Sequence, residues 1–390
     1  MSGELFGGTM GTSGTGMSPA GKESGDVFSV RLSNLREKIW QAGANALVVF
    51  CLEGRNWENV YYLSGFKGSH SALVVGLDRC VLVTDGRYLR QAAEQTSLEI
   101  AEQGSGGLIS SVLEILQNWK AGKVALEYRR ILHSVARFLF GQTGMEWIDG
   151  SSFVEDLRRI KTPAEAGCVA RAGKLCAAAL EELLPVLEPG MTERQIAARL
   201  EFSIRMNGAE STWGEHEFIV ASGLRSALPH GTPTDKPVCE GEWITLDFGA
   251  RVDGYLCDVT RNIAIGKVPS LALSLHSLLE RAQEEAFRHV RPGIRTSEVD
   301  SIARSVISSA GYGQAFTHGL GHGLGLELHE APRISRFSDD VLLEGDIVTI
   351  EPGVYLSGFG GLRVEDDCLV TKTGACWLTK NVPGGFLQAL

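Results

Sequence analysis

The stretch GEWITLDFG, at positions 241–249, is matched by GDIVTIEPG at positions 345–353. Both copies run from a glycine through a short apolar segment to an acid, and the two acids, Asp247 and Glu351, lie 104 positions apart. Short apolar runs bounded by glycine predict a buried strand in each copy. We therefore expect two related strands, each of which delivers one carboxylate.

The chain before each strand carries the same duplication. Pro-Gly pairs at positions 189–190 and 292–293 each end a helical pattern, and a new helix follows each pair. The first of these helices begins with Thr192 and Gln195, a capping box that satisfies the free amides at a helix start. The duplication predicts two helix–helix–strand–strand halves related by a pseudo-twofold axis, with the two acids meeting near that axis.

Upstream of the duplication, residues 27–155 alternate helical and strand-like segments, which predicts an α/β domain. Strands are expected at residues 46–51, 71–75 and 80–84, and helices at residues 30–42, 111–119 and 131–140. Residues 156–390 are expected to form an α+β domain that contains the duplication. Residues 1–26 hold eight glycines and little apolar surface, so we expect a flexible tail there.

Composition disfavours several classes of partner. The formal net charge of −10 argues against nucleic acid or an anionic membrane as the main partner, because both need a basic footprint. We expect no membrane span and no secretory signal, since a long apolar run is missing. The eight cysteines form no C-x-x-C pair, which favours reduced, buried thiols and a cytoplasmic protein.

Four acids stand in or beside apolar strands: Asp247, Asp258, Glu351 and Glu365. Asp258 follows Asp247 after a short turn, so their strands are expected to be antiparallel. Glu365 follows Glu351 after a Gly-rich turn expected at residues 358–361. A carboxylate in an apolar strand costs on the order of several kcal/mol unless it is paired or binds a metal. Two divalent cations would nearly neutralise four converging acids, so the pattern predicts a metal centre.

A further ligand is expected from HGLGHGLGLELHE, residues 318–330, which holds three of the nine histidines in the chain. Its glycines allow close approach of the backbone. The stretch lacks the G-x-G-x-x-G spacing of a dinucleotide loop, and Pro332 argues against a zinc-binding helix. Taken alone, His230 is a turn histidine. The chain has neither a G-x-S-x-G elbow nor a phosphate-binding loop motif.

Five blocks of sequence carry a family resemblance: IVASGLRSALPH (219–230), TLDFGARVDGYLCDVTRNI (245–263), HGLGHGLGLELHEAP (318–332), TIEPGVY (349–355) and GGLRVED (360–366). The chain resembles the pita-bread metallopeptidases, peptidase family M24, and most closely their Xaa-Pro branch of aminopeptidase P and prolidase. The first domain resembles the creatinase/prolidase N-terminal domain through YLSGFKGS (62–69) and TDGRY (84–88). The resemblance implies that residues 156–390 adopt the pita-bread fold.

The resemblance implies a centre of two metal ions held by Asp247, Asp258, His322, Glu351 and Glu365. Asp258 and Glu365 would bridge both ions, Asp247 would bind one, and His322 and Glu351 would bind the other. Glu351 would also handle the proton of the bridging water. A ligand set of mostly oxygen with one nitrogen suits manganese, with cobalt, iron or zinc as alternatives.

Further roles are implied for residues around the metals. His230 and His329 would contact the scissile amide and its tetrahedral intermediate, and His318 would help to seat the peptide. Arg363 would orient the metal-bound carboxylates. The family usually has an aromatic residue where this chain has His216, a departure that bears on the pocket for the first substrate residue.

The implied function is that of an Xaa-Pro aminopeptidase, which cleaves the bond between an N-terminal residue and a following proline. An Xaa-Pro dipeptidase is the alternative, and it needs a cation for the free carboxylate of its substrate. Arg333 is a candidate for this cation, although an exposed loop arginine explains it equally well. A metal-free, creatinase-like or binding member of the fold is a distant alternative, because no ligand is lost. The resemblance also implies a homodimer.

Overall fold

The computed structural model describes residues 25–214 and 216–389. The flexible tail expected for residues 1–26 lies outside the described residues except for its last two positions. The described chain divides into two compact units. Among the described residues, the first unit comprises 25–125 and 137–148, and the second comprises 126–136, 149–214 and 216–389.

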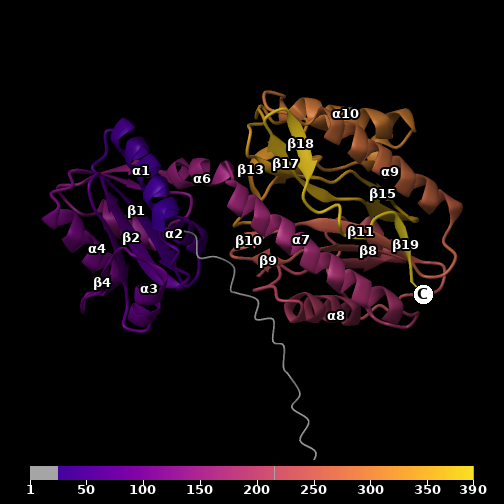
Figure 1. Ribbon diagram of the computed structural model, residues 1–390, viewed down its shortest axis with the longest axis horizontal. Helices are drawn as coiled ribbons and strands as arrows, with labels where there is room; N and C mark the ends of the chain where they lie inside the picture. Colours follow the sequence, from indigo (N-terminus) through magenta and orange to yellow (C-terminus); the bar gives the residue numbers. More distant parts are fainter. Residues whose placement is uncertain (1–24, 215, 390) are drawn as a thin grey trace, which may run out of the picture. The chain divides into compact units, whose positions relative to one another are not determined.

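A six-stranded sheet in the order β4-β3-β2-β1-β5-β6 forms the centre of the first unit. Its strands are β1 (Ala46–Leu52), β2 (His70–Gly76), β3 (Cys80–Thr84), β4 (Glu99–Glu102), β5 (Lys123–Leu126) and β6 (Glu146–Asp149). The helices of this part of the chain are α1 (Gly25–Gln41), α2 (Trp57–Ser64), α3 (Leu89–Gln95), α4 (Gly107–Asn118) and α5 (His133–Phe140). Helix α2 packs against β1 and α4 against β2 (Figure 1). Because β1 is central and buried, its sequence ALVVFCL is almost wholly apolar.

The expected α/β class is confirmed for this unit, with more elements than the sequence indicated. The three expected strands correspond to β1, β2 and β3, and the three expected helices to α1, α4 and α5. The edge strands β4 and β6 were not expected. Each has only four residues, EIAE and EWID, whose ends are exposed, so neither shows a usable apolar pattern.

The second unit contains two similar halves. In the first half β7, β8 and β11 lie side by side, and in the second half β12, β14 and β17 do, with antiparallel pairing inside each trio. The trios are β7 (Ile219–Ser222), β8 (Trp243–Phe248) and β11 (Val259–Ala264), and β12 (Gly321–Gly323), β14 (Ile347–Ile350) and β17 (Asp366–Thr371). The outer strands are β13 (Glu330–Ile334), β18 (Gly374–Trp377) and β19 (Phe386–Gln388). The internal duplication predicted from the sequence is therefore confirmed.

Each half also contributes a pair of packed helices. These are α7 (Pro163–Leu183) with α8 (Glu193–Met206), and α9 (Ser270–His289) with α10 (Thr296–Ser309); α6 (Ser151–Arg159) precedes them. Figure 1 shows the two pairs on opposite sides of the strands. The capping box of α8 forms as expected, with the Gln195 amide donating to Thr192 Oγ1 at 3.2 Å. Among the described residues, every helix is too short or too polar to cross a bilayer.

Contacts between the two halves join β8 and β11 to the segment that contains Gly361 and Glu365. The Trp243 indole N–H of β8 donates to Gly361 O at 2.8 Å, and Thr260 of β11 forms an isolated bridge with Glu365. Trp243 also joins the core cluster that contains Leu279 of α9 and Val348 and Ile350 of β14. Burying one such side chain contributes about 1.5–3 kcal/mol. The acids predicted to meet are therefore carried on one packed framework.

We expected a turn at residues 358–361, and this prediction was wrong for Gly360 and Gly361. Gly360 and Gly361 belong to the short strand β16 (Gly360–Arg363), which pairs with β15 (Gly353–Leu356). A Cβ atom on Gly360 would lie 2.8 Å from Ser226 Oγ, so another segment passes too close for a side chain. These glycines thus permit close packing of a strand, which a turn pattern does not distinguish.

All eight cysteines are free, and six of them are buried. Cys239 and Cys376 are exposed, so the expectation of buried thiols was wrong for these two. No pattern in the sequence marked Cys239 and Cys376 as exposed. Cys239 lies in the loop before β8 and Cys376 in the edge strand β18, which explains their exposure.

Candidate metal centre

The first repeat carries Asp247 and Asp258. Strand β8 is buried along its whole length, and Asp247 lies opposite Thr260 of β11. Asp258 directly precedes β11, and its backbone amide donates a hydrogen bond of 3.0 Å to Asp367 Oδ2. Antiparallel pairing of β8 with β11 therefore brings the two acids to the same end of the sheet.

The second repeat carries Glu351, Glu365 and His322. Glu351 immediately follows β14, and Glu365 stands between β16 and β17, bridged to Thr260 of the first sheet. His322 is the middle residue of β12, and its amide donates to Thr349 Oγ1 at 3.1 Å. The five predicted ligands thus come from both sheets, and the contact between the repeats determines whether they meet.

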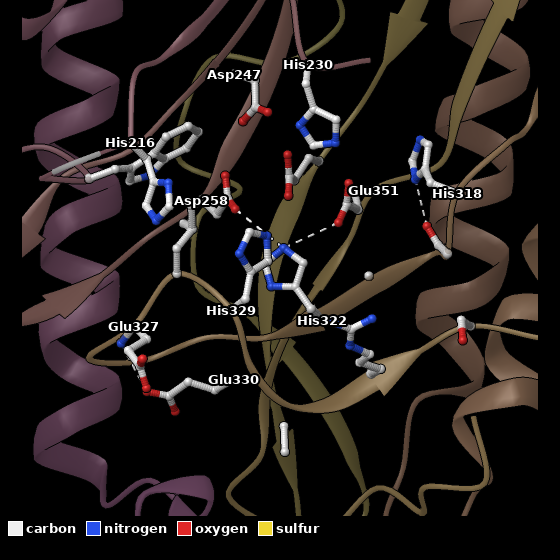
Figure 2. A pocket seen from close by; sticks show the side chains of 18 of the residues that line it. His216, His230, Asp247, Asp258, His318, His322, Glu327, His329, Glu330 and Glu351 are labelled. Carbon is white, nitrogen blue, oxygen red and sulfur yellow. Dashed lines mark hydrogen bonds and ion pairs between the residues drawn. The ribbon is translucent and has the colours of Figure 1, made fainter. Parts of the chain in front are cut away.

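The five predicted ligands line one cavity of about 980 Å³. Figure 2 shows four of them facing its interior: Asp247, Asp258, His322 and Glu351. Ligand atoms of Asp258, His322 and Glu365 lie within 4.8 Å of one another. His322 Nε2 lies 3.4 Å from Glu351 Oε1 and 3.7 Å from Asp258 Oδ2. Asp258, His322, Glu351 and Glu365 are therefore close enough to share bound cations.

The His322 ring presents a lone pair to these acids. Its Nδ1 lies 3.0 Å from Gly323 O, and a carbonyl oxygen can only accept, so Nδ1 carries the hydrogen. Burial, with a smaller contribution from His329, lowers the pKa of His322 to about 3. The ring is therefore neutral at pH 7, with Nε2 available as a metal ligand.

Arg363 lies buried among the carboxylates that it was predicted to orient. It donates to Asp247 Oδ2, and its Nε lies 3.9 Å from Glu365 Oε2. The Thr260 hydroxyl donates to Glu365 Oε2 at 2.6 Å and accepts from Arg363 Nε at 3.0 Å. Thr260 was not identified from the sequence, because the run DVTRN does not show which side chain faces the acids.

Burying several like charges together raises their pKa values. Burial, followed by the charge of Glu365, raises the pKa of Asp258 well above its usual range. Burial and the charge of Glu351 do the same to Glu365. Burial raises the pKa of Glu351 to about 8, despite the nearby Arg363. Divalent cations at this place would reverse these shifts, because they stabilise ionised carboxylates.

Two buried carboxylate oxygens, Asp247 Oδ1 and Asp258 Oδ1, have no hydrogen-bond partner within the described chain. Buried polar atoms are nearly always paired, and an unpaired acceptor costs about 1–3 kcal/mol. Cation ligation would satisfy both oxygens. Oxygen donors with a single imidazole nitrogen are the set that manganese and related divalent ions prefer. The residues present therefore fit a divalent metal centre.

Three further histidines line the same cavity: His230, His318 and His329. The His329 ring lies 4.3 Å from the His322 ring, edge to face, and His318 Nε2 lies 3.1 Å from Tyr355 Oη. Burial lowers the pKa of His318 to about 4 and also lowers that of His329. Both rings are neutral at pH 7. His318 donates its Nδ1 hydrogen to Gly319 O at 2.8 Å, which leaves Nε2 as an acceptor, whereas His329 can donate one N–H to a bound peptide.

His216 and Arg333 complete the predicted set of cavity residues. Arg333 lies opposite His322 in the pairing of β12 with β13, and its side chain is exposed. Burial lowers the pKa of His329, and the nearby His216 lowers it further. Figure 2 shows His216 and His329 on the same side of the cavity.

A cluster of ion pairs flanks His329 and was not expected from the sequence. Glu327 Oε2 lies 2.6 Å from Arg130 and 2.9 Å from Arg158, and Glu330 Oε2 lies 2.9 Å from Lys161. Glu330 and Lys161 are 169 positions apart in the chain. Pairing over such a distance leaves no local pattern, so only the fold shows that the segment around His329 is anchored.

Gly321→Ala is expected to weaken both the fold and metal binding. A Cβ atom at this position would overlap Thr349 O of the neighbouring strand. We expect a loss of roughly 1–3 kcal/mol of stability, and His322 would be displaced with β12. Thermal unfolding and a manganese titration measure the two effects. The control is Gly374→Ala, where a Cβ atom meets nothing within 4 Å; equal behaviour of both variants would contradict the argument.

Family models and known proteins match most of this chain. The model of metallopeptidase family M24 matches residues 167–372, and that of the creatinase/prolidase N-terminal domain matches residues 31–160. The Xaa-Pro dipeptidase of Pyrococcus furiosus is 36% identical over 324 residues, which cover 83% of this chain and 91% of the relative.

Solved structures show the same similarity. The Xaa-Pro dipeptidase from Bacillus anthracis has a TM-score of 0.87 and 34% identity, covering 93% of this chain and 99% of that chain. The X-Pro aminopeptidase from Thermotoga maritima has a TM-score of 0.85 and 35% identity, covering 92% and 99%. These matches confirm the resemblance and the fold class that the sequence indicated. The chain belongs to metallopeptidase family M24.

Proposed function

We propose that this protein is a dinuclear metallopeptidase that cleaves the bond between an N-terminal residue and a following proline. The main support is the group of four acids and His322 around one cavity. Two buried oxygens of this group, Asp247 Oδ1 and Asp258 Oδ1, have no hydrogen-bond partner within the described chain. Relatives named Xaa-Pro dipeptidase and X-Pro aminopeptidase support the substrate class. We expect hydrolysis of such peptides to stop when metal is removed by a chelator and to return with manganese.

The metal ions would be held by Asp247, Asp258, His322, Glu351 and Glu365. Two divalent cations, when bound, supply a nucleophilic water at neutral pH and polarise the scissile carbonyl. Asp258 and Glu365 are central to the group, and we assign them to both ions. Manganese is the proposed metal, because the donors are mostly oxygen.

The cavity histidines stabilise the charge that develops on the substrate. His230 and His329 would donate hydrogen bonds to the oxyanion, and one well-placed donor contributes about 3 kcal/mol. Glu351, whose Oε1 lies 3.4 Å from His322 Nε2 at the metal site, would take a proton from the attacking water and pass it on. The proline nitrogen needs this proton as it leaves, and an X-Pro amide has no N–H of its own.

The choice between aminopeptidase and dipeptidase depends on how the carboxyl side of proline is recognised. A dipeptide ends there in a carboxylate, whereas a longer peptide continues. Arg333 is exposed at the cavity, so it can bind such a carboxylate. We keep Xaa-Pro aminopeptidase as the main proposal, and this observation favours dipeptidase as the second candidate.

Arg333→Met separates the two candidates. If Arg333 binds a substrate carboxylate, kcat/KM for an Xaa-Pro dipeptide should fall about tenfold or more, since a charged hydrogen bond contributes about 1.5–3 kcal/mol. Hydrolysis of an Xaa-Pro-Yaa tripeptide should change much less. Arg336→Met is the matched control, because Arg336 stacks on Phe337. Absence of tripeptide cleavage by the unmodified protein would reject the aminopeptidase proposal.

We also propose a cellular compartment and an oligomeric state for the enzyme. Eight free cysteines suit a reducing compartment, and we propose the cytoplasm. The family resemblance supports a homodimer, which sedimentation of the purified protein would test. A creatinase-like or purely binding role is disfavoured, because all five predicted ligands are present. Protein that contains no metal and cleaves no peptide after addition of manganese would favour that alternative.

A further inference from the structure

We propose that Glu193 and Asp300 are positioning residues that hold two catalytic loops over the metal centre. Each lies in the second helix of its repeat, Glu193 in α8 and Asp300 in α10. We name the two segments the His230 loop, residues 223–234, and the His318 loop, residues 316–320. The inference rests on the proposed function, because that function assigns roles to the two histidines.

Glu193 closes the His230 loop at both of its ends. Its carboxylate is fully buried, and Oε1 accepts hydrogen bonds of 2.9 Å from both the amide and the hydroxyl of Ser222. Oε2 accepts from the amide and hydroxyl of Thr234 at 3.1 and 2.7 Å, and from Arg225 Nε at 3.0 Å. Five donor groups therefore bond to one carboxylate and fix the start and the end of the loop.

The loop is also held close to His230 itself. Arg225 NH2 donates to Thr232 O at 2.7 Å, two positions after the histidine. Pro229 O, the carbonyl before it, accepts from Arg363 NH1 at 3.1 Å. Arg363 is the guanidinium that contacts the metal-centre carboxylates. The segment around His230 is thus bonded on one side to Arg225, the partner of Glu193 in α8, and on the other to Arg363 at the metal centre.

The second repeat uses the same kind of anchor. Asp300 is fully buried, accepts from the Leu320 amide at 3.1 Å, and pairs with Arg304 at 2.9 Å. Arg304 donates to Phe316 O at 2.8 Å and to His318 O at 2.9 Å, and its guanidinium lies 4.1 Å from the Phe316 ring centre. A buried carboxylate with an arginine therefore fixes each histidine loop.

Stabilisation of the start of helix α8 does not explain the contacts of the Glu193 carboxylate. The start of α8 is already satisfied by its capping box, in which Thr192 N donates to Gln195 Oε1 at 2.9 Å. The Glu193 carboxylate makes its bonds to the loop instead. Glu193, Arg225, Asp300 and Arg304 are all absent from the residues that line the cavity. We therefore assign their effect on catalysis to the loops that they hold.

Glu193→Gln tests the first anchor. Glutamine keeps one acceptor oxygen but places an NH2 group against the donors of Thr234 or of Ser222. With manganese present, kcat should fall about tenfold or more, because a histidine that contacts the reacting amide is no longer held in place. KM should change less than about threefold, and the metal content should be unchanged. Thr192→Ala is the matched control, because it breaks the capping box and leaves the loop bonds intact.

Arg304→Met tests the second anchor and should give the opposite kinetic pattern. His318 is assigned to seat the peptide, so KM should rise about fivefold while kcat changes little. Ser305→Ala is its control, since Ser305 is exposed and bonds only within α10, to Ser301 O at 2.7 Å. Both controls should leave kcat and KM within about twofold of the unmodified protein, because neither residue touches a histidine loop.

Amide hydrogen exchange gives a measure that does not need activity. Glu193→Gln should increase exchange at the Thr234 amide, whereas Thr192→Ala should not. If Glu193→Gln fails to fold, Thr234→Val removes one bond to Oε2 and should show the same direction of effect. Equal kinetics and equal exchange in variant and control would overturn the proposal, as would loss of metal in Glu193→Gln. Unmodified protein that cleaves no Xaa-Pro peptide would overturn the proposed function, and exchange alone would then decide the anchoring.

Discussion

Asp258→Asn is expected to lower kcat/KM for an Xaa-Pro peptide by at least about a thousandfold, or roughly 4 kcal/mol of transition-state stabilisation. Asp258 Oδ1 is buried and unpaired, and Oδ2 lies 3.7 Å from His322 Nε2, so this carboxylate is placed to bind two ions. Asparagine offers one neutral oxygen and cannot bridge. Steady-state kinetics and elemental analysis should show that activity and at least one ion are lost together.

The same substitution should have the opposite effect on metal-free protein. Burial and the neighbouring acids raise the pKa of Asp258, so its charge costs stability at pH 8 in the fold. Chelator-treated Asp258→Asn should therefore unfold at a higher temperature than the chelator-treated unmodified protein. The control is Asp235→Asn, an exposed partner of Arg194 whose loss should change neither quantity. A variant that keeps two ions and full activity would refute the assignment.

Metal-free protein is expected to lose stability as the pH rises from 6.5 to about 8.5. The pKa values of Asp258, Glu365 and Glu351 are raised in the fold, that of Glu351 to about 8. The folded chain therefore binds more protons than the unfolded chain, and the stability present at low pH is lost as the pH passes the folded pKa values. The unfolding temperature should fall by roughly 5 °C or more across this window.

The histidines set the lower limit of the pH range over which the metal-free protein loses stability. Burial lowers the pKa of His318 to about 4 and of His322 to about 3. These rings resist protonation in the fold, so they favour stability as the pH rises, but only up to their unfolded pKa of about 6.5. Thermal unfolding with chelator at several pH values, repeated with manganese, measures the effect. A flat or rising profile without metal above pH 6.5 would contradict it, and manganese should remove the fall.

The sequence predicted the parts of the fold that repeat or are buried throughout. Residues 243–248 and 347–350 form strands, as expected, because a short apolar run bounded by glycine is typical of a buried strand. Their shared pattern also indicated that Asp247 and Glu351 belong together. The choice of His322 among three neighbouring histidines rested on family resemblance, since spacing alone does not show which ring turns inward.

The remaining features depend on long-range contacts. Thr260 bonds to Glu365 across 105 positions, and Glu193 bonds to Thr234 across 41, so neither shows a local pattern. Gly360 and Gly361 suggest a turn in sequence, yet they allow β16 to pack closely. Such residues become recognisable only once the strands and helices that they join are in place.

The most direct test is anomalous scattering from crystals grown with manganese and measured at its absorption edge. We expect two peaks within coordination distance of Asp258 and Glu365, with His322 bound to one ion and Asp247 to the other. A single peak, or peaks outside the ring of these side chains, would contradict the assignment of a shared two-ion centre.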